Sequence, residues 1–436
     1  MKKKMIIAIS VFLMFSSVSC EKKNSPEISG DIPEVSEEPT TIKLATFYNM
    51  SKTEKNLISK MKEKSGTNVD ITYYNYTETS EPFELLNLDM ISGDCPDVLC
   101  VPPQDMYNFI KAGYMSDMYP LLEKSPTLNK ESFLPNVLSG LDVDEKLPAI
   151  CDGFILSTAV AKTKIVGETA ENWTPQQALE LLNTIPEDTA FLAYSSKAVD
   201  VPYYLTERLA IDAIDYKNNT CNFDGEYKEV LNFIENSPEF LDFTHTDFAE
   251  YSLIDDTALI GEITIWGIDN SISCNTFQNF NGEDITFVGY PSETGKGYLT
   301  EGSTMFGIPE ICTQKEEAFE LISLMISDVS VNSYLNMGIP ALEKRVQDDL
   351  KTSKYTQTSI NCPVNINGEE VQMPEEKIQK VMDYIRNITF EPYNQNTEIN
   401  NIVRQEFSRF LNKEISAQEC TDILNNRLSL YLSETN

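Results

Sequence analysis

Side chains that could support nucleophilic or metal catalysis are few in this sequence, and their spacing does not match known sites. His245 is the only histidine among the 436 residues, so a Ser-His-Asp or Cys-His site would have to be built on it. Its surroundings, Phe243 to Phe248 (FTHTDF), contain no nucleophile-elbow motif such as Gly-x-Ser-x-Gly. A single histidine and scattered cysteines also disfavour a zinc site.

Two short segments are similar to ligand-binding loops but depart from them at essential positions. In Gly289 to Gly297 (GYPSETGKG), five residues instead of four separate the first two glycines, and Gly297 stands where Ser or Thr should bind Mg²⁺. We interpret this segment as a turn. Asp142 to Glu145 (DVDE) lacks the further ligands and the central glycine of a calcium loop, so we interpret these residues as solvated loop acids.

Paired carboxylates are the catalytic option that the composition leaves open. The chain has 68 acidic and 34 basic residues and a formal charge of −34; losing Lys2, Lys3 and Lys4 with a signal segment changes it to −37 (−34 minus 3). A glycosidase uses two carboxylates, but nothing in the sequence nominates one pair. Phosphate recognition needs basic patches, so nucleic acid and anionic lipid headgroups are disfavoured as partners.

The first forty residues have the composition of an export signal followed by a tether. Lys2 to Lys4 precede an apolar tract from Met5 to Phe15, and small residues lead to Cys20. The tract is shorter than the roughly 20 residues of a membrane span, which predicts a secretory signal over residues 1–19. Residues 21–40 are polar and contain proline, so we expect a disordered tether there.

Strand and helix patterns alternate in the first part of the folded region. Thr41–Phe47 alternates apolar side chains and predicts a strand, and Ser51 with Glu54 forms a capping box for a helix that ends at Gly66. A second strand at 69–73, a helix at 82–92 and the apolar run Val98–Val101 follow. This βαβ series predicts a right-handed parallel sheet with helices beside it.

The rest of the chain predicts a second layer of strands and several closing helices. Thr174, Pro175 and Gln177 mark a helix start. Strands are expected near 260–266, 285–291 and 301–308, followed by helices with apolar stripes, the last of which begins with Ser416 and Glu419. About 395 residues after the tether exceed what one core usually serves, so two lobes are expected.

The nine cysteines leave the redox state open. Apart from Cys20, they are spread widely, and several lie inside apolar runs. Buried free thiols and disulfide bridges are both compatible with this distribution.

Several short motifs, taken in order, resemble the extracellular solute-binding proteins of ABC importers, in particular those that bind carbohydrates. In the first half they are Gly93, Pro96-Asp97, Ala112-Gly-Tyr114 and Asp117–Leu121 (DMYPL); in the second half they are Gly261–Trp266 (GEITIW), the aromatic-proline pair Tyr290-Pro291 and the return segment Glu301–Ile308. The small residues before Cys20 resemble a lipoprotein acylation motif, with Ser17 at a position where leucine is usual. The resemblance covers about residues 41–436.

This resemblance implies an α/β, two-lobed periplasmic-binding-protein-like (Venus flytrap) fold, in which each lobe is a mainly parallel sheet flanked by helices. Residues 41–150 plus 303–336 would form the first lobe, and residues 151–302 plus 337–436 the second lobe with the C-terminal helices; residues 20–40 would be the lipidated cysteine and its tether. Asp97 is expected to be structural. By the same resemblance, Trp173, which directly precedes the helix start at Thr174, is expected to be a packing residue.

The family places its ligand contacts on loops at the strand ends of both lobes. Carried over to this sequence, these contacts are aromatic, amide and acidic side chains of the kind that bind sugar rings and hydroxyls: Tyr48, Asn49, Tyr76, Asp105, Asp152, Tyr203, Trp266, Asp269, Glu301 and Ser303. For Tyr203, Tyr204 and Trp266, packing inside the second lobe is the alternative role.

By resemblance, the protein is expected to be a lipid-anchored binding protein at the outer face of the cell membrane. It would bind a small solute, which the resemblance suggests is a sugar or oligosaccharide, deliver it to an ABC permease, and need no cofactor or metal. Two alternatives stay open: a surface hydrolase that acts on glycans with paired carboxylates, and a non-transport surface protein that binds a protein partner.

Overall fold

The computed structural model describes residues 40–74, 81–167, 172–186, 189–193, 197–198, 200–216, 218–243, 253, 256–267, 283–327, 338–352, 375–393 and 396–434. Residues 39–436 form one compact unit. Cys20, Tyr76, His245 and Asp269 lie outside the described residues. In the part of the chain that is described, no helix combines the length and apolar character that a membrane span requires.

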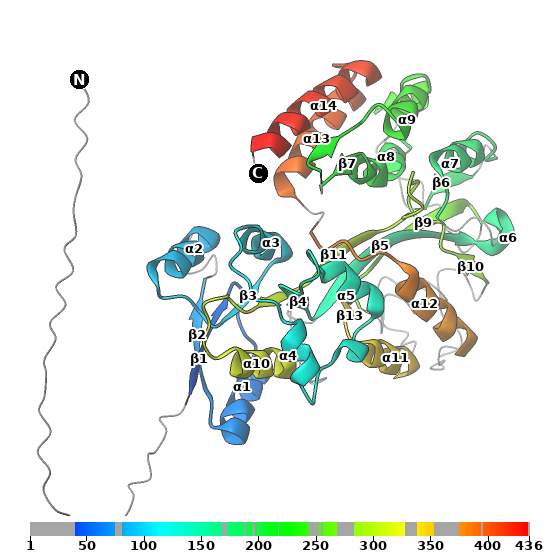
Figure 1. Ribbon diagram of the computed structural model, residues 1–436. Helices are drawn as coiled ribbons and strands as arrows, with labels where there is room; N and C mark the ends of the chain where they lie inside the picture. Colours follow the sequence, from blue (N-terminus) through cyan, green and yellow to red (C-terminus); the bar gives the residue numbers. More distant parts are fainter. Residues whose placement is uncertain are drawn as a thin grey trace, which may run out of the picture. The chain divides into compact units, whose positions relative to one another are not determined.

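Helices and strands alternate along the chain as a mixed α/β protein (Figure 1). The strands are β1 (Thr41–Thr46), β2 (Asn68–Tyr73), β3 (Val98–Val101), β4 (Ile150–Cys151), β5 (Gly153–Lys162), β6 (Ala190–Leu192), β7 (Ile214–Asp215), β8 (Thr220–Cys221), β9 (Ala258–Ile265), β10 (Ile285–Thr286), β11 (Leu299–Gly302), β12 (Met305–Gly307) and β13 (Ile339–Pro340). The helices are α1 (Lys52–Ser65), α2 (Pro82–Ser92), α3 (Pro103–Lys111), α4 (Tyr119–Lys124), α5 (Pro135–Leu141), α6 (Thr163–Val166), α7 (Pro175–Leu182), α8 (Asp200–Asp212), α9 (Glu226–Glu235), α10 (Lys315–Ser327), α11 (Glu343–Thr352), α12 (Glu375–Asn387), α13 (Thr397–Leu411) and α14 (Ala417–Glu434), with short 3₁₀ turns at Lys130–Ser132 and Pro238–Leu241.

The first sheet has five strands in the order β2-β1-β3-β12-β4. β1 pairs in parallel with β2 and β3, as the βαβ pattern predicts, and β12 returns antiparallel between β3 and β4. All residues of β3 are buried, which explains its uninterrupted apolar sequence. Asp97 joins β3 to β1, because its carboxylate accepts the Lys43 N–H at 2.8 Å; its expected structural role is confirmed.

The second sheet is centred on β5 and has the main order β10-β5-β9-β6, with β11 and β13 also on β5. The expectation of a mainly parallel sheet is wrong here: every neighbour of β5 runs antiparallel, and β6 with β9 is the parallel pair among the described strands. Residue patterns report burial but not strand direction, since helix-covered strands of either kind are apolar throughout. The overall α/β class is confirmed, with mixed sheets.

Local signals at helix ends are confirmed where their geometry is described. The Ser51 hydroxyl accepts the Glu54 N–H at 3.3 Å, and Gly66 ends α1 with a φ of 75°. Thr174 accepts the Gln177 N–H at 3.3 Å and caps α7. Trp173 is 3% exposed and donates its indole N–H to the Gly289 carbonyl at 3.1 Å, so its packing role is confirmed.

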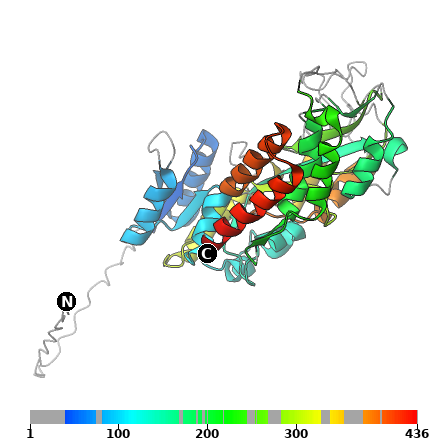
Figure 2. The same cartoon turned by 90° about the horizontal axis from the view of Figure 1, so that it is seen from above.

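Two apolar cores stabilise the fold. One joins the first sheet with α5, α11, α12 and the face of β5 that carries Phe154 and Leu156. The other lies between α7, α8, α9, α13, α14 and the distal part of the second sheet. Helices α13 and α14 lie side by side and α14 contacts α9 (Figures 1 and 2). On the opposite face of β5, Ile155 belongs to neither core.

Candidate functional site

The two sheets are connected by extended segments that lie side by side at Asp152. Asp152 separates β4 from β5, and Ser303 with Thr304 separates β11 from β12. The backbone N–H of Asp152 donates to the Thr304 carbonyl at 3.3 Å, and the N–H of Ala341, next to β13, donates to the Asp152 carbonyl at 3.0 Å. Three passages of the chain therefore meet at one residue.

The Asp152 side chain strengthens this junction. Its Oδ1 accepts the Ser303 hydroxyl, and it also accepts the Thr304 N–H at 3.1 Å. Its Oδ2 is buried without a hydrogen-bond partner among the described residues. Burial raises the pKa of Asp152 to about 7, against the opposing effect of the Ser303 and Thr304 hydrogen bonds and of Arg345. Near neutral pH this carboxyl group is therefore poised between its two protonation states.

The carboxyl ends of the first parallel strands place Tyr48 and Asp105 next to this junction. Tyr48 follows β1, its backbone N–H is held by the Thr46 hydroxyl at 3.0 Å, and its phenol group hydrogen-bonds with Thr304. Burial, and then the charges of Cys100, Asp152 and Asp105, raise the pKa of Tyr48. Asn49, the next residue, is exposed. The strand-end position expected for these side chains is observed.

Asp105 lies in the first turn of α3, directly after β3. Burial raises its pKa to about 6, because loss of solvent disfavours the charged carboxylate. Tyr107, two residues further along α3, stacks on Tyr393 with a ring-centroid distance of 5.1 Å. The Tyr393 hydroxyl is buried and has no partner in the described part of the chain.

On the second sheet, Glu301 and Trp266 lie on either side of Ile155. Glu301 is paired with Ile155 in the β11–β5 register, so their side chains share a face of the sheet. Trp266 directly follows β9 at the level where β13 begins, and its carbonyl accepts the Gly338 N–H at 2.8 Å. Its side chain is 52% exposed. Trp266 is therefore a surface aromatic at a strand end and not a core residue.

Tyr203 lines a cavity of about 160 Å³ between α8, β11 and α13. Its ring packs edge-on against Phe407 at 5.0 Å, while its neighbour Tyr204 is fully buried and donates to the Gly289 carbonyl. Tyr204 therefore has the alternative role, packing inside the second lobe, whereas Tyr203 faces the cavity. Leu299, two residues before Glu301, lines the same cavity, so Tyr203 and Glu301 lie near each other.

Three charged residues of this region carried no sequence signal. Glu207 and Arg404 line the cavity with Tyr203, and Glu262 on β9 lies close enough to Glu207 for their charges to interact. Burial and then the Glu207 charge raise the pKa of Glu262 to about 7, and burial raises that of Glu207 while Arg404 opposes the rise. The spacing of Tyr203 and Glu207 by four residues on a helix was the available indication that they share a face.

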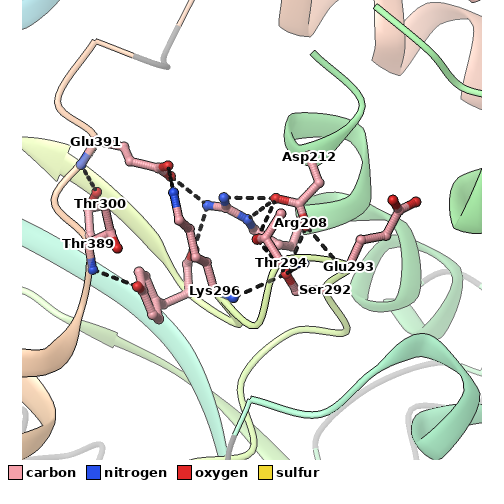
Figure 3. A network of polar contacts seen from close by, with 10 residues as sticks. Arg208, Asp212, Ser292, Glu293, Thr294, Lys296, Thr300, Thr389 and Glu391 are labelled. Carbon is pink, nitrogen blue, oxygen red and sulfur yellow. Dashed lines mark hydrogen bonds and ion pairs between the residues drawn. The ribbon is translucent and has the colours of Figure 1, made fainter. Parts of the chain in front are cut away.

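A buried ionic network connects α8 with Lys296 and with Glu391, which lies between α12 and α13 (Figure 3). Arg208 is 3% exposed, donates to Glu391 at 2.9 Å and to the Tyr298 carbonyl at 3.1 Å, and pairs with Asp212 at 2.9 Å. Lys296 donates to the other Glu391 oxygen at 2.7 Å. Burial opposes ionisation of Glu391, but Arg208 and Lys296 hold its pKa below the usual value. The segment that leads into α13 is thereby fixed to β11.

The described candidate residues thus form two groups. Tyr48, Asp105, Asp152 and Ser303 interact directly or through their charges at the junction. Trp266 and Glu301 flank β5 next to the junction. Tyr203 lies near Glu301, because Leu299 of the same strand lines the cavity with Tyr203. Asn49 is placed next to Tyr48 by sequence. The structure does not describe Tyr76 and Asp269.

Comparison with known proteins supports the fold. The family 1 extracellular solute-binding protein of Alicyclobacillus acidocaldarius subsp. acidocaldarius has a TM-score of 0.59 at 11% identity, covering 91% of this chain and 99% of that one. The sugar-binding protein MalE of the phytopathogen Xanthomonas citri gives 0.56 at 14% identity, covering 91% and 98%. A de novo designed cysteine esterase gives 0.55 at 13% identity, covering 92% and 100%. No family model matches the sequence, and no curated protein matches it.

At these identities the comparison establishes the fold and not the activity. The chain has the two-lobed α/β architecture of the extracellular solute-binding proteins, over nearly the full length of each. The resemblance suggested by the sequence motifs is confirmed at this level.

Proposed function

We propose that this protein is the substrate-binding component of an ABC importer and that it captures a small solute, a sugar or oligosaccharide, between its two lobes. The observation that carries this proposal is the convergence of Tyr48 and Asp105 from the first sheet on the Asp152–Ser303 junction, with Trp266 and Glu301 just beyond. Aromatic faces and desolvated carboxylates suit sugar rings and their hydroxyl donors. The likeness in fold to a sugar-binding protein supports the same solute class.

In this proposal, the first lobe consists of residues 41–150 and 303–336. The second lobe consists of residues 151–302 and 337–436. A solute that touches both lobes favours the closed arrangement by its differential affinity for that state. The closed form is then recognised by a membrane permease. Neither step requires a cofactor.

A thermal-shift screen with mono- and oligosaccharides tests the proposal. A ligand that binds only the folded state stabilises it by about 2.7 kcal/mol at one hundred times its Kd, so a matching saccharide should raise Tm in a concentration-dependent manner. If no saccharide or other small solute changes Tm, the binding function is wrong.

Anchoring through Cys20 is part of the proposal. Acylation there would hold the protein at the outer face of the cell membrane through residues 21–40. Cys20→Ser should release the protein into the medium, as measured by fractionation. Retention of the variant in the membrane fraction would contradict the anchor while leaving solute binding untouched.

Hydrolysis of glycans is the second candidate, and the raised pKa values of Asp105 and Asp152 favour it specifically, because a general acid needs such a pKa. Incubation with labelled glycans distinguishes the two functions. We expect bound but unchanged glycan; cleavage that disappears in Asp105→Asn would establish the hydrolase instead.

A further inference from the structure

A groove of about 450 Å³ separates α3 from the start of α13 and from α14. One wall of this α3–α13 groove consists of four residues of α3: Gln104, Tyr107, Asn108 and Lys111. They form one face of the helix, because residues three and four positions apart lie together. The volume of the groove falls within the range of about 300–1,000 Å³ that is typical of ligand sites.

The α3–α13 groove adjoins the candidate site. Gln104 lines the groove, and its neighbour Asp105 belongs to the group of residues at the junction. Tyr107 also lines the groove, and its ring stacks on Tyr393 of the segment that leads into α13. Because α3 follows β3 of the first sheet and α13 packs in the core of the second sheet, a ligand in the groove would contact both proposed lobes.

The walls of the groove carry hydrogen-bonding groups that the protein itself does not use. Gln104 and Asn108 have amide groups and Thr397 has a hydroxyl group, and these three side chains form no hydrogen bond with a described residue. Amides and hydroxyls both donate and accept, as the hydroxyls of a sugar require. Lys111 and Glu398, one charge of each sign, are the charged residues of the described lining, so the groove suits an uncharged ligand.

The wall of the groove that is formed by α13 and α14 is held in place by its own contacts. Asn396 caps α13, because its Oδ1 accepts the Glu398 and Ile399 N–H groups at 3.0 and 3.1 Å. Its Nδ2 donates to the Tyr431 hydroxyl of α14 at 3.3 Å. A wall that is already ordered reduces the entropic cost of binding a ligand.

We propose that the solute is an oligosaccharide and that one of its outer rings binds in the α3–α13 groove, while other rings occupy the site at the junction. This inference rests on the proposed solute-binding function and specifies its ligand class. The amide groups of Gln104 and Asn108 and the Thr397 hydroxyl bond to the hydroxyls of the outer ring. A shorter saccharide that is held at the junction leaves these groups to water.

Calorimetric titration of the full chain with malto-, cello- and xylo-oligosaccharides of increasing length tests this. In the series that binds, we expect the affinity to increase at least about tenfold from the disaccharide to the tetrasaccharide. The increase arises because the longer ligand adds several neutral hydrogen bonds, each of which changes an affinity by about two- to tenfold.

Substitutions locate this gain in affinity. Asn108→Ala and Thr397→Ala truncate exposed side chains on opposite walls of the groove. The double variant should reduce the gain to about threefold or less, while its affinity for the disaccharide stays within about twofold of the wild type. Asn56→Ala on α1 truncates another exposed amide that forms no hydrogen bond with a described residue; it is the matched control and should leave the gain unchanged.

The possible outcomes separate this inference from the proposed function. If the affinity does not increase beyond the disaccharide, or if the double variant keeps the full gain, the groove inference is wrong and saccharide binding stands. The groove inference is also wrong if the double variant weakens the disaccharide and the tetrasaccharide by the same factor, or if Asn56→Ala removes the gain as well. If no saccharide of any length binds, both proposals are overturned.

Discussion

Asp152 belongs both to the candidate site and to the junction between the two sheets. Its backbone is bonded to two other passages of the chain, its Oδ1 is satisfied, and its Oδ2 is not. Its side chain is 3% exposed. A buried carboxyl with one free oxygen gains stability when protonated, because the neutral form tolerates burial better than the charged form.

This carboxyl group should make stability depend on pH. The pKa of Asp152, about 7, lies above the usual carboxyl value. Between roughly pH 4 and pH 7 the carboxyl group is therefore protonated in the folded state and ionised in the unfolded state. The contribution of Asp152 is therefore largest below this window and falls as the pH rises through it, by at most about 4 kcal/mol. Urea unfolding at several pH values measures it.

Asp152→Asn serves as the reference in this experiment, because the amide is neutral at every pH. Subtracting its stability curve from that of the wild type removes the other titrating groups. The difference should decline from pH 4 to pH 7 and be flat above. A difference that rises with pH would contradict the assignment.

Trp266 should carry a large share of saccharide affinity if the proposed site is right. Trp266→Ala removes an exposed ring at a strand end, and stacking plus buried apolar area predict a loss of about 10- to 100-fold. Calorimetric titration measures it. Ile311→Ala, which truncates another exposed apolar side chain (64% exposed), is the control and should not change affinity. Equal affinities of both variants and wild type would place the site elsewhere.

Among the elements, the segment between α12 and α13 is fixed to its neighbours by several polar contacts. Thr389 and Glu391 are bonded through their backbones to Tyr298 and Thr300 of the β11 region, and Arg208 of α8 holds the Glu391 side chain (Figure 3). The ionic network also includes α8, which contributes Tyr203 and Glu207 to the lining of the cavity.

Arg208→Met should destabilise the protein by about 3–5 kcal/mol, because it leaves the buried Asp212 carboxylate without its counter-ion and leaves Glu391 with Lys296 alone. Urea denaturation measures the loss. Lys228→Met, which breaks an exposed pair with Asp224, should cost less than about 1 kcal/mol. Similar costs for the two variants would show that the network contributes no more than a surface pair.

Gly338 precedes β13 and has a φ of 107°. A β-carbon at this position would lie 2.3 Å from the Phe154 carbonyl oxygen, so a larger residue should displace β13. Gly338→Ala should cost clearly more stability than Gly66→Ala, where φ is 75° and nothing lies within 4 Å. For the latter, about 1–2 kcal/mol of backbone strain is expected. Equal losses would mean that β13 shifts without cost.

The elements of the first sheet could be predicted from the sequence, because local signals specify them. The Ser51 capping box, the Gly66 stop and the buried run of β3 all lie where the residue patterns put them. The return strand was predicted as one element from 301 to 308, but it is divided into β11 and β12 by Ser303 and Thr304. Strand direction in the second sheet depends on pairing between distant segments, which local patterns do not encode.

The candidate site was predictable only in part for the same reason. Strand-end residues such as Tyr48 and Asp105 follow from the rule that parallel strands present their carboxyl ends together. Glu207 and Arg404 lie on different helices, nearly two hundred residues apart in the chain, and meet only through packing of α8 with α13. No periodicity along one segment indicates such a pair.

At the scale of the whole molecule, the fold joins two sheets through several neighbouring passages of chain. The described passages lie at Asp152, at Ser303–Thr304, at Ile339–Ala341 and at Thr389–Glu391. Passages of this kind, bonded to one another, can act as a hinge whose bending changes the angle between the sheets while each sheet stays intact. The proposed function requires this motion to be coupled to the solute.

Small-angle scattering of the protein with and without a saturating saccharide ligand tests this coupling most directly. The account predicts a smaller radius of gyration with ligand, and no such change in Trp266→Ala at the same ligand concentration. A radius of gyration that is unchanged by a ligand shown calorimetrically to be bound would contradict capture between two closing lobes.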